Sequence, residues 1–416
     1  MQKLQGTVGL FMLLALGIQP GAMVAEVIQP SSKQPLKIAQ QNIAAAIYVS
    51  PNGTDAAGAG SQATPFRTIT AALSSNPQPG TTIKLAPGTY STETGEVFPL
   101  KLLPGVNIQG NSSTNGQDIL IKGGGVFVSP SFARQNIAML AAKNAGISGI
   151  TLTNSNPRGY ALWVESSRNV KITNNTFINT THDGVFLTGD ANATITSNLF
   201  TKNRASGISA LGTSTGEIKG NEFNDTGFGL SIGKNSQVQV IGNRIINNVD
   251  GIVISNLATP TLRGNLIANS KRNGLVILKD RNGQPNPDLG TAASPGLNII
   301  KGNKDKDLTN ATGVTYVVVG NEIDKKRVAG SLDLVPASSP LSLPQISPSA
   351  SAKPNSPNEK PTATKPPTKP SQTKPAATKP AKSTQTKPTA TTKPKPSQSK
   401  PAAVKPNKPS QDKPNT

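Results

Sequence analysis

KITNNTFIN (residues 171–179) returns four times in altered form along the chain, always with an asparagine just before a short apolar run. The later copies are TITSNLFTKN (194–203), EIKGNEFND (217–225), QVIGNRIINN (239–248) and TLRGNLIANS (261–270). The asparagines that they share are Asn175, Asn198, Asn221, Asn243 and Asn265. A second row with the same period consists of Gly184, Gly207, Gly229, Gly251 and Gly274. Two rows with steps of about 22 to 23 residues are typical of a solenoid.

Each repeat holds three short apolar runs in which alternate residues are hydrophobic. In one repeat these are Val185 with Leu187, then Ile195, then Leu199 with Phe200. Alternation with period two predicts strands, and no window shows sustained helical spacing. Three strands and their bends fill one repeat, so the sequence predicts an all-β, single-stranded parallel β-helix. Equivalent strands would stack about 4.8 Å apart.

The two repeated residue types predict structural roles at the bends. Asparagine tolerates left-handed backbone, and its amide can bond to the asparagines above and below it, which predicts a structural ladder. The repeated glycines permit either positive φ or close approach of two backbones. The residues expected to face inward are Ile172, Phe177, Ile195, Ile218, Phe223, Val240, Ile245, Leu262 and Ile267.

Composition divides the 416 residues into four segments. Residues 1–25 read as a signal peptide because Lys3 precedes an apolar run, 8–18, that is too short to span a bilayer. Residues 26–46 read as a linker and 47–335 as the β-helix domain, with 47–110 forming its cap and first coils. Residues 336–416 are a Lys/Pro/Thr-rich tail that we expect to be disordered. If the signal is not cleaved, it would act as a membrane anchor, which is the only membrane contact expected.

The net charge of +21 comes mostly from the tail. A polycation binds polyanions, and the signal peptide favours an acidic or cell-envelope polysaccharide as that partner. Nucleic acid is not expected because the tail has no aromatic residue on which a base could stack. A solubilising spacer is the alternative role for the tail. We therefore predict a monomeric protein that is secreted, periplasmic or associated with the cell envelope.

The opening of the domain is the most distinctive part of the sequence. It reads YVSPNGTD (48–55), PFRTITAAL (65–73), TIKLAPGTY (82–90), GEVFPL (95–100) and LPGVNIQGN (103–111). Ala71, Ala72 and Leu73 predict a short helix that covers the first coil, and Asn111 has the same setting as the later asparagines. This module resembles a bacterial domain-of-unknown-function family in the pectin-lyase-like superfamily, and it is similar to the start of some secreted pectate lyases. Over about residues 47–333 the resemblance implies a right-handed β-helix and a carbohydrate-related context, but no particular reaction.

The resemblance also implies where a ligand would lie, on the outer face of the strand that follows each glycine. Alternation predicts that the outward residues of this strand are Ala161, Phe186, Ser209, Ser231, Val253 and Val276. Polar residues gather at the bend before it. The catalytic candidates are His182, Asp183 and Arg204, since a His beside an Asp suits acid–base chemistry and Arg204 could act as a lyase base. The candidates for carbohydrate binding are Trp163, Phe186, Asp250 and Arg272.

The spacing of these residues argues against catalysis. Neighbours on an extended chain point opposite ways, so His182 and Asp183 need not cooperate. Asp183 and Asp250 fall in register three coils apart, or about 14 Å, whereas a glycosidase needs carboxyls within about 5 to 9.5 Å. No stack supplies the three or four acids that calcium prefers. We therefore expect no metal and no cofactor, with calcium only if the protein is a lyase.

Three functions remain open. The favoured one is a non-catalytic protein that binds or scaffolds carbohydrate at the cell envelope, because candidate carboxylates are sparse. A polysaccharide lyase or epimerase acting on uronate chains is the first alternative, and a surface adhesin is the second.

Overall fold

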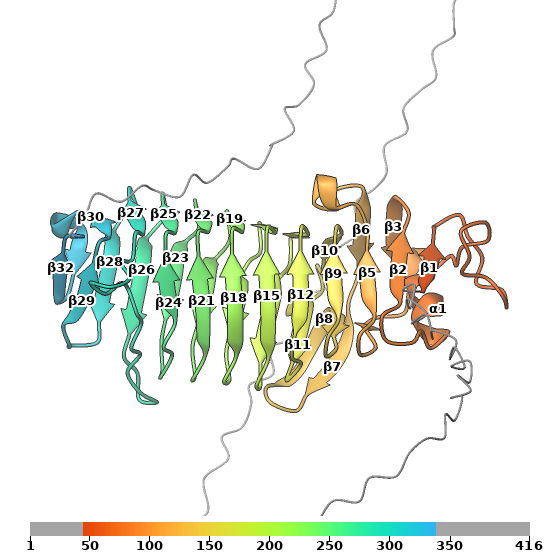
Figure 1. Cartoon of the computed structure of the whole chain (residues 1–416), viewed down its shortest axis with the longest axis horizontal. Coiled ribbons are helices and arrows are strands. Elements are labelled where there is room, and N and C mark those ends of the chain that lie inside the picture. The colour runs from red at the N-terminus through yellow and green to blue at the C-terminus, as the bar shows by residue number, and fades with distance from the viewer. Residues whose placement is uncertain (1–44, 338–416) are drawn as a thin grey trace, which may run out of the picture. The chain divides into compact units, whose positions relative to one another are not determined.

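The computed structural model describes residues 45–337. The predicted signal peptide (1–25), all but the last two residues of the predicted linker (26–46) and nearly all of the predicted tail (336–416) lie outside the described residues. Within 45–337, short parallel strands stack coil upon coil into three long sheets, as Figure 1 shows. The predicted parallel β-helix is therefore confirmed.

Sheet A contains the first strand of each coil and has nine strands. They are β1 (Ala46–Val49), β2 (Thr82–Leu85), β5 (Asn107–Gln109), β9 (Gly146–Ser148), β12 (Val170–Thr173), β15 (Asn192–Thr196), β18 (Thr215–Lys219), β21 (Gln237–Ile241) and β24 (Thr261–Arg263).

Sheet B contains the second strand of each coil and has ten strands. They are β3 (Gly88–Ser91), β6 (Ile119–Lys122), β10 (Thr151–Thr153), β13 (Thr176–Ile178), β16 (Leu199–Thr201), β19 (Glu222–Asn224), β22 (Arg244–Ile246), β25 (Leu266–Ala268), β27 (Ile299–Lys301) and β30 (Glu322–Ile323).

Sheet C contains the strand after each glycine, and it carries the outer face on which a ligand was expected. Its parallel strands are β4 (Leu100–Lys101), β8 (Ala133–Ala141), β11 (Gly159–Glu165), β14 (Val185–Thr188), β17 (Ser206–Ala210), β20 (Phe228–Ile232), β23 (Asp250–Ile254), β26 (Asn273–Leu278), β28 (Lys306–Ala311) and β31 (Val328–Ala329). An additional strand, β7 (Gly125–Ser129), pairs antiparallel with β8. A separate pair near the end joins β29 (Tyr316–Val319) to β32 (Leu332–Val335).

The asparagine ladder is present between sheets A and B, and it is longer than the sequence predicts. The side-chain amide of Asn198 donates to Asn221 Oδ1 at 3.0 Å and to the Ile172 carbonyl at 2.9 Å. Asn298 and Asn321 continue the row beyond Asn265, with amide-to-oxygen distances of 2.8 and 2.7 Å. Asn111 stands outside the ladder, because its side chain caps the 3-10 helix η2 (Ser112–Thr114).

The backbone roles of the two rows differ from the prediction. The left-handed residue at the ladder bend is the one before each asparagine, for example Ser197 at φ 57° and Gly220 at φ 60°. The repeated glycines are not left-handed. Instead, a Cβ on Gly207 would lie 2.4 Å from Phe223 Cδ1 and 2.8 Å from the Gly229 carbonyl oxygen, so close packing excludes a side chain there.

The interior of the stack is filled by the residues that alternation placed inward. Phe177, Phe200 and Phe223 stack face to face, with centroid distances of 4.9 and 4.7 Å. All nine predicted inward residues are buried. The phenylalanines are therefore part of the core, and each coil depends on its neighbours for burial.

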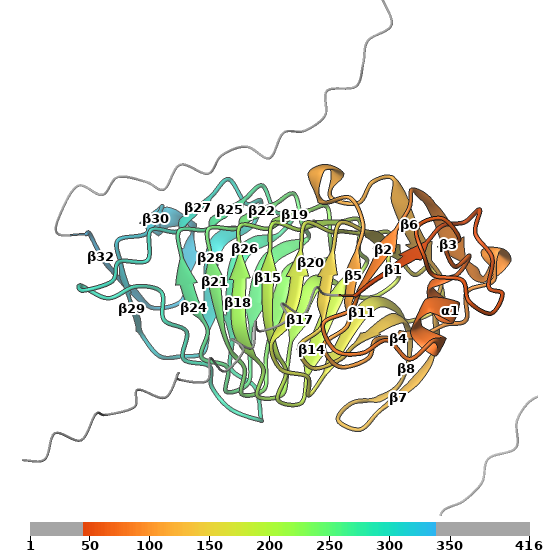
Figure 2. The same cartoon turned by 45° about the vertical axis from the view of Figure 1, so that its right-hand side comes forward.

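The predicted capping helix is α1 (Ile69–Ser74), which lies beside the first strands in Figure 2 and buries Ile69 and Ala72. Two acids hold its N-terminus. Asp55 accepts from the Thr68 main-chain N–H at 3.0 Å, and buried Glu96 accepts from those of Ile69 and Thr70 at 2.6 and 2.9 Å. Burial raises the pKa of Glu96 in spite of these hydrogen bonds, which act in the opposite direction.

Two further elements complete the described chain. A loop after Lys279 interrupts the period, between β26 and β27, and Asp288 within it forms an isolated β-bridge with Thr261. The other 3-10 helices are η1 (Thr92–Thr94) and η3 (Lys325–Arg327). Among residues 45–337, no helix has the length and apolar character needed to cross a bilayer.

Candidate functional site

The outer face of sheet C is defined by strand register. One row of outward side chains follows the stack through consecutive pairings: Trp163, Phe186, Ser209, Ser231, Val253, Val276 and Thr309. The row departs from the prediction at its start, because Ala161 and Leu162 both belong to the core. Strict alternation therefore breaks in β11, and Trp163 takes the outward position that was expected of Ala161.

Aromatic rings cluster at the amino-terminal end of this face. Trp163 stacks on Phe186 with centroids 4.2 Å apart, and Tyr160 packs edge-on against both rings. The cluster is buried although it lies outside the stack, and Trp163 itself is 0% exposed. A sugar could therefore reach Trp163 or Phe186 only if the covering segment moved.

The covering segment is the hairpin formed by β7 and β8, which the sequence analysis did not identify. Phe127 of β7 packs edge-on against Trp163 at 5.9 Å, and Phe132 in the turn packs against Phe186 at 4.9 Å. The run Val126-Phe127-Val128, of β-branched and aromatic residues, is a weak strand signal. Nothing local in the sequence says that this strand turns back on β8 instead of joining the stack.

A carboxylate holds the hairpin turn in place. Glu165 accepts hydrogen bonds from Ser129 and, at 2.6 Å, from Ser131, both of which lie at the turn. It also accepts from the indole N–H of Trp163 at 3.1 Å, while Ser131 Oγ lies 3.0 Å from Thr188 Oγ1. Glu165 thus joins the hairpin to sheet C.

His182 and Asp183 lie closer together than an extended chain would allow. Nδ1 of His182 is 3.3 Å from Asp183 Oδ1, because His182 occupies the bend before β14 and not the strand itself. On the other side, the His182 ring stacks on Tyr160, and its Nε2 is 3.3 Å from the phenol oxygen. Burial, with the nearby Asp183 charge as a second cause, raises the pKa of Tyr160, so its phenol stays protonated at neutral pH.

Asp183 and Asp250 each accept a hydrogen bond from a main-chain N–H of the next coil. Asp183 Oδ1 accepts from the Ser206 main-chain N–H at 2.7 Å, and Asp250 Oδ1 accepts from that of Asn273 at 3.0 Å. Their other oxygens differ. Asp250 Oδ2 pairs with Arg272, whereas Asp183 Oδ2 has no hydrogen-bond partner within residues 45–337.

The two aspartates do not form a catalytic pair. Asp183 bonds to Ser206 of the next coil, Ser206 pairs with Phe228, and Phe228 pairs with Asp250. Two coils therefore lie between the coil of Asp183 and the coil of Asp250. Three strand spacings amount to about 14 Å. In the part of the chain that the structure describes, no three His, Cys, Asp or Glu side chains gather as a metal site would require.

Exposed cations line the bend between sheet B and sheet C. They are Arg158, Lys202, Arg204, Lys271, Arg272 and Lys304, and we call them the cationic edge. Lys271 pairs with Asp225 at 2.8 Å and Arg272 with Asp250. Arg158, Lys202, Arg204 and Lys304 form no salt bridge with any described residue. The predicted site residues Arg204 and Arg272 therefore lie together with other cations on one exposed edge.

The model of the DUF1565 family, whose description is "Protein of unknown function", matches residues 51–328. The chain belongs to this family. The predicted membership of a domain-of-unknown-function family is thus confirmed, and the match spans most of the DUF1565 β-helix described above. No curated protein matches the chain.

Solved structures similar to this DUF1565 chain include three carbohydrate-active proteins. Pectate lyase Pel9A has 13% identity and a TM-score of 0.47, covering 71% of this chain and 78% of its own. A double mutant of the periplasmic alginate epimerase AlgG has 14% identity and a TM-score of 0.36, covering 62% and 74%. Polygalacturonase from Erwinia carotovora ssp. carotovora has 13% identity and a TM-score of 0.34, covering 71% and 93%. The fold described here rests on the strand register and not on these matches.

Proposed function

We propose that this protein is a non-catalytic β-helix that binds acidic polysaccharide at the cell envelope, with the cationic edge as its contact surface. The observation that carries the proposal is the position of Arg158, Arg204 and Lys304 at equivalent bends of different coils, all exposed. A polymer with a carboxylate on each sugar could meet these cations one after another along the stack.

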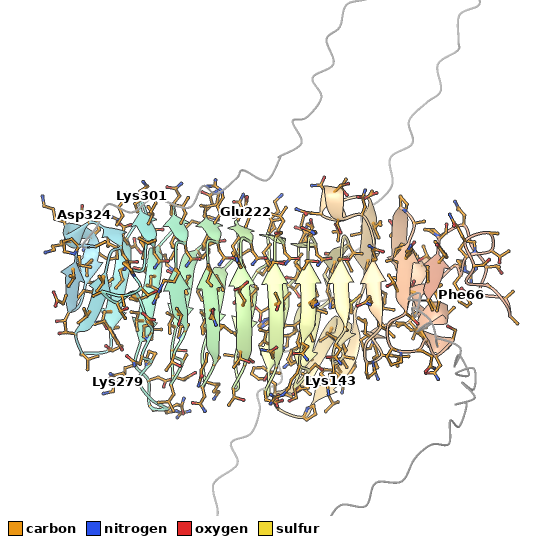
Figure 3. The ribbon with its side chains drawn as sticks, viewed as in Figure 1. Phe66, Lys143, Glu222, Lys279, Lys301 and Asp324 are labelled. Carbon is orange, nitrogen blue, oxygen red and sulfur yellow. The ribbon has the colours of Figure 1, made fainter. Side chains whose placement is uncertain are left out.

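Charge in the described residues supports this partner. Between residues 45 and 337 there are 25 Lys and Arg against 18 Asp and Glu, a net charge of +7. Several of the acids are also withdrawn from the surface, since Asp183, Asp250 and Asp307 are buried. Figure 3 shows labelled charged side chains, including Lys279 and Lys301, at the periphery of the coils.

The arrangement of polar groups favours binding over turnover. Asp183 and Asp250 are engaged with backbone N–H groups, and they are too far apart to share a glycosidic bond. Tyr160 is held protonated by its raised pKa and so does not serve as a base. The predicted tail, with fourteen lysines against two acids from Ser351 onward, would add a second, sequence-independent attraction to the same polymer.

A lyase or epimerase acting on uronate chains is the second candidate. The contact between His182 and Asp183 favours it, because a carboxylate beside Nδ1 orients an imidazole for acid–base work. The His182 side chain is half-buried and so remains partly open to solvent.

Binding is tested by retardation of the full-length protein in gels that contain polygalacturonate or alginate. We expect Arg158→Ala with Arg204→Ala to weaken binding about 5- to 30-fold, since each exposed charge contact contributes about 0.5–1 kcal/mol. The matched control is Lys171→Ala with Lys219→Ala, which removes the same charge from the outer face of sheet A.

Equal losses in the edge variant and in the sheet A control would show that net charge alone drives binding, and would refute the cationic edge. A chain that ends at residue 337 separates the tail from the edge. If the cationic edge contacts the polysaccharide, this shorter chain should still bind it, with weaker affinity and less dependence on salt. Binding that vanishes with the tail would assign the polymer contact to the tail instead.

A further inference from the structure

The hairpin of β7 and β8 extends out of the stack and lies over an aromatic surface. β7 pairs with no strand other than β8, and it projects from the side of sheet C in Figures 1 and 2. Its inner face carries Phe127 with Gln135 directly opposite, and Phe127 contacts Trp163. β7 and the start of β8 therefore act as a cover, whereas the rest of β8 is the sheet C strand of its coil.

The two legs of this cover join the stack at separate points. At the foot of β7, Gly123, Gly124 and Gly125 follow one another where neighbouring atoms lie too close for a side chain. The other leg joins sheet C only from Asn136 onward, where β8 first pairs with β11. Beyond these two points the hairpin has no strand partner in the stack.

The contacts that close the cover are few, three of them polar and three aromatic. Ser129 and Ser131 donate to Glu165, and Ser131 also contacts Thr188. The aromatic contacts come from Phe127 and from Phe132, which is 40% exposed. Opening the hairpin would therefore break only three hydrogen bonds and three ring contacts.

Polar atoms without partners lie in the covered layer. Both polar atoms of the Gln135 side chain and Oδ2 of Asp183 have no hydrogen-bond partner among the described residues. Gln135 is 3% exposed and Asp183 is 1% exposed. Buried polar groups are normally paired. Asp250 occupies the equivalent position three coils away, and its Oδ2 pairs with Arg272. The fold therefore does not prevent an aspartate at this position from pairing its second oxygen.

We propose that the layer beneath the β7–β8 hairpin is a sugar-binding site and that the hairpin is its movable cover. This inference rests on the proposed function, which it supplies with a second contact beside the cationic edge. A site for small ligands combines apolar lining with a few oriented polar groups, and a pyranose ring matches both with its C–H face and its hydroxyls.

The row order suggests how the sugar lies. One face of Phe186 stacks on Trp163, and on the other side its register partner is Ser209. Both are buried, so a ring could lie beside Phe186 only once the hairpin has opened. Hydroxyls of the sugar donate to Asp183 Oδ2 and Gln135 Oε1. A uronate carboxylate would then point toward Arg158 and Arg204 at the cationic edge and away from Asp183.

Trp163 is the only tryptophan in the chain, so its fluorescence reports directly on the cover. Ser129→Ala with Ser131→Ala removes the hydroxyls that bind Glu165 and leaves the Trp163 contact with Glu165 intact. We expect acrylamide quenching of Trp163 to rise at least twofold in this variant, and oligogalacturonate to change the emission. Ser155→Ala, at an exposed site, is the control. Quenching equal to wild type would contradict a movable cover.

Because the chain has no cysteine of its own, one engineered disulfide can hold the hairpin closed. Ser131 Oγ and Thr188 Oγ1 are 3.0 Å apart, so Ser131→Cys with Thr188→Cys places two sulfurs close enough to bond. Oxidation should reduce oligogalacturonate affinity at least tenfold, and reduction of the same sample should restore it. Thiol counting establishes that the disulfide has formed.

The outcomes separate this inference from the function on which it rests. Polymer binding that is unaffected by oxidation would refute the covered site and leave the cationic edge standing. If the wild type retains neither polygalacturonate nor alginate, the proposed function fails. In that case the quenching experiment alone decides whether the hairpin opens.

Discussion

Asn221 shows what one residue contributes to the ladder. Its amide donates to the Ile195 carbonyl at 2.8 Å and to Asn243 Oδ1 at 3.0 Å. Its oxygen accepts from both the main chain and the side chain of Asn198. These bonds satisfy backbone groups at a buried bend, where water does not replace them.

Asn221→Ala should lower the free energy of unfolding by about 1–3 kcal/mol, because buried backbone groups are left unpaired. Urea titration followed by circular dichroism measures the change. Asn235→Ala is the control, since Asn235 is exposed and its side chain makes no hydrogen bond with another described residue. Its cost should stay below about 0.5 kcal/mol. Similar midpoints for the two variants would contradict the ladder's role.

Gly207→Ala tests close packing at the second row. The added methyl would meet Phe223 at 2.4 Å and the Gly229 carbonyl oxygen at 2.8 Å. Both neighbours are fixed by the stack, so overpacking should cost about 1–3 kcal/mol in the same titration. Ser231→Ala, on the outward row of the next coil, should change stability little. A Gly207→Ala protein as stable as wild type would mean that neighbouring coils can shift apart.

At the scale of elements, α1 depends on an acid from a distant part of the chain. Glu96 accepts from two main-chain N–H groups of this helix and, at 2.5 Å, from the Thr70 hydroxyl. Burial nevertheless raises its pKa above the ordinary value. The folded protein therefore holds this proton more tightly than the unfolded chain does.

The sign of the pH effect follows from this raised pKa. The contribution of Glu96 to the free energy of unfolding is complete below the ordinary glutamate pKa of about 4.3. It is lost as pH rises through the higher pKa of Glu96 in the folded protein. Relative to Glu96→Gln, which does not titrate, wild type should lose stability over that interval. Urea midpoints of both proteins at successive pH values measure the difference. A difference that stays constant, or grows with pH, would contradict the raised pKa.

The sequence predicts some elements far better than others. Strands of the regular coils follow from alternation because each faces a buried interior on one side, as Ile195 and Ile218 illustrate. The β7–β8 hairpin did not follow, since its pairing depends on Phe127 meeting Trp163 across a gap in sequence. The position of His182 was also missed, because a bend brings Nδ1 back toward Asp183.

At the scale of the whole molecule, the period of the repeat decides where charges lie. Residues at equal offsets stand one strand spacing apart, so the bend before sheet C collects Arg158, Arg204 and Lys304 on one edge. The same rule keeps Asp183 and Asp250 apart. Sequence alone could therefore predict the fold and the separation of the aspartates, while the cover over Trp163 required the three-dimensional arrangement.

Turnover and binding by one sample test the central claim most directly. The full-length protein is titrated with polygalacturonate and with alginate at increasing salt, and each mixture is then assayed for unsaturated uronate by its ultraviolet absorbance. A non-catalytic polysaccharide-binding protein should show saturable binding that weakens as salt rises, with no product formed. Product that accumulates with wild type and disappears with His182→Ala would contradict it and would establish the lyase in place of the binding protein.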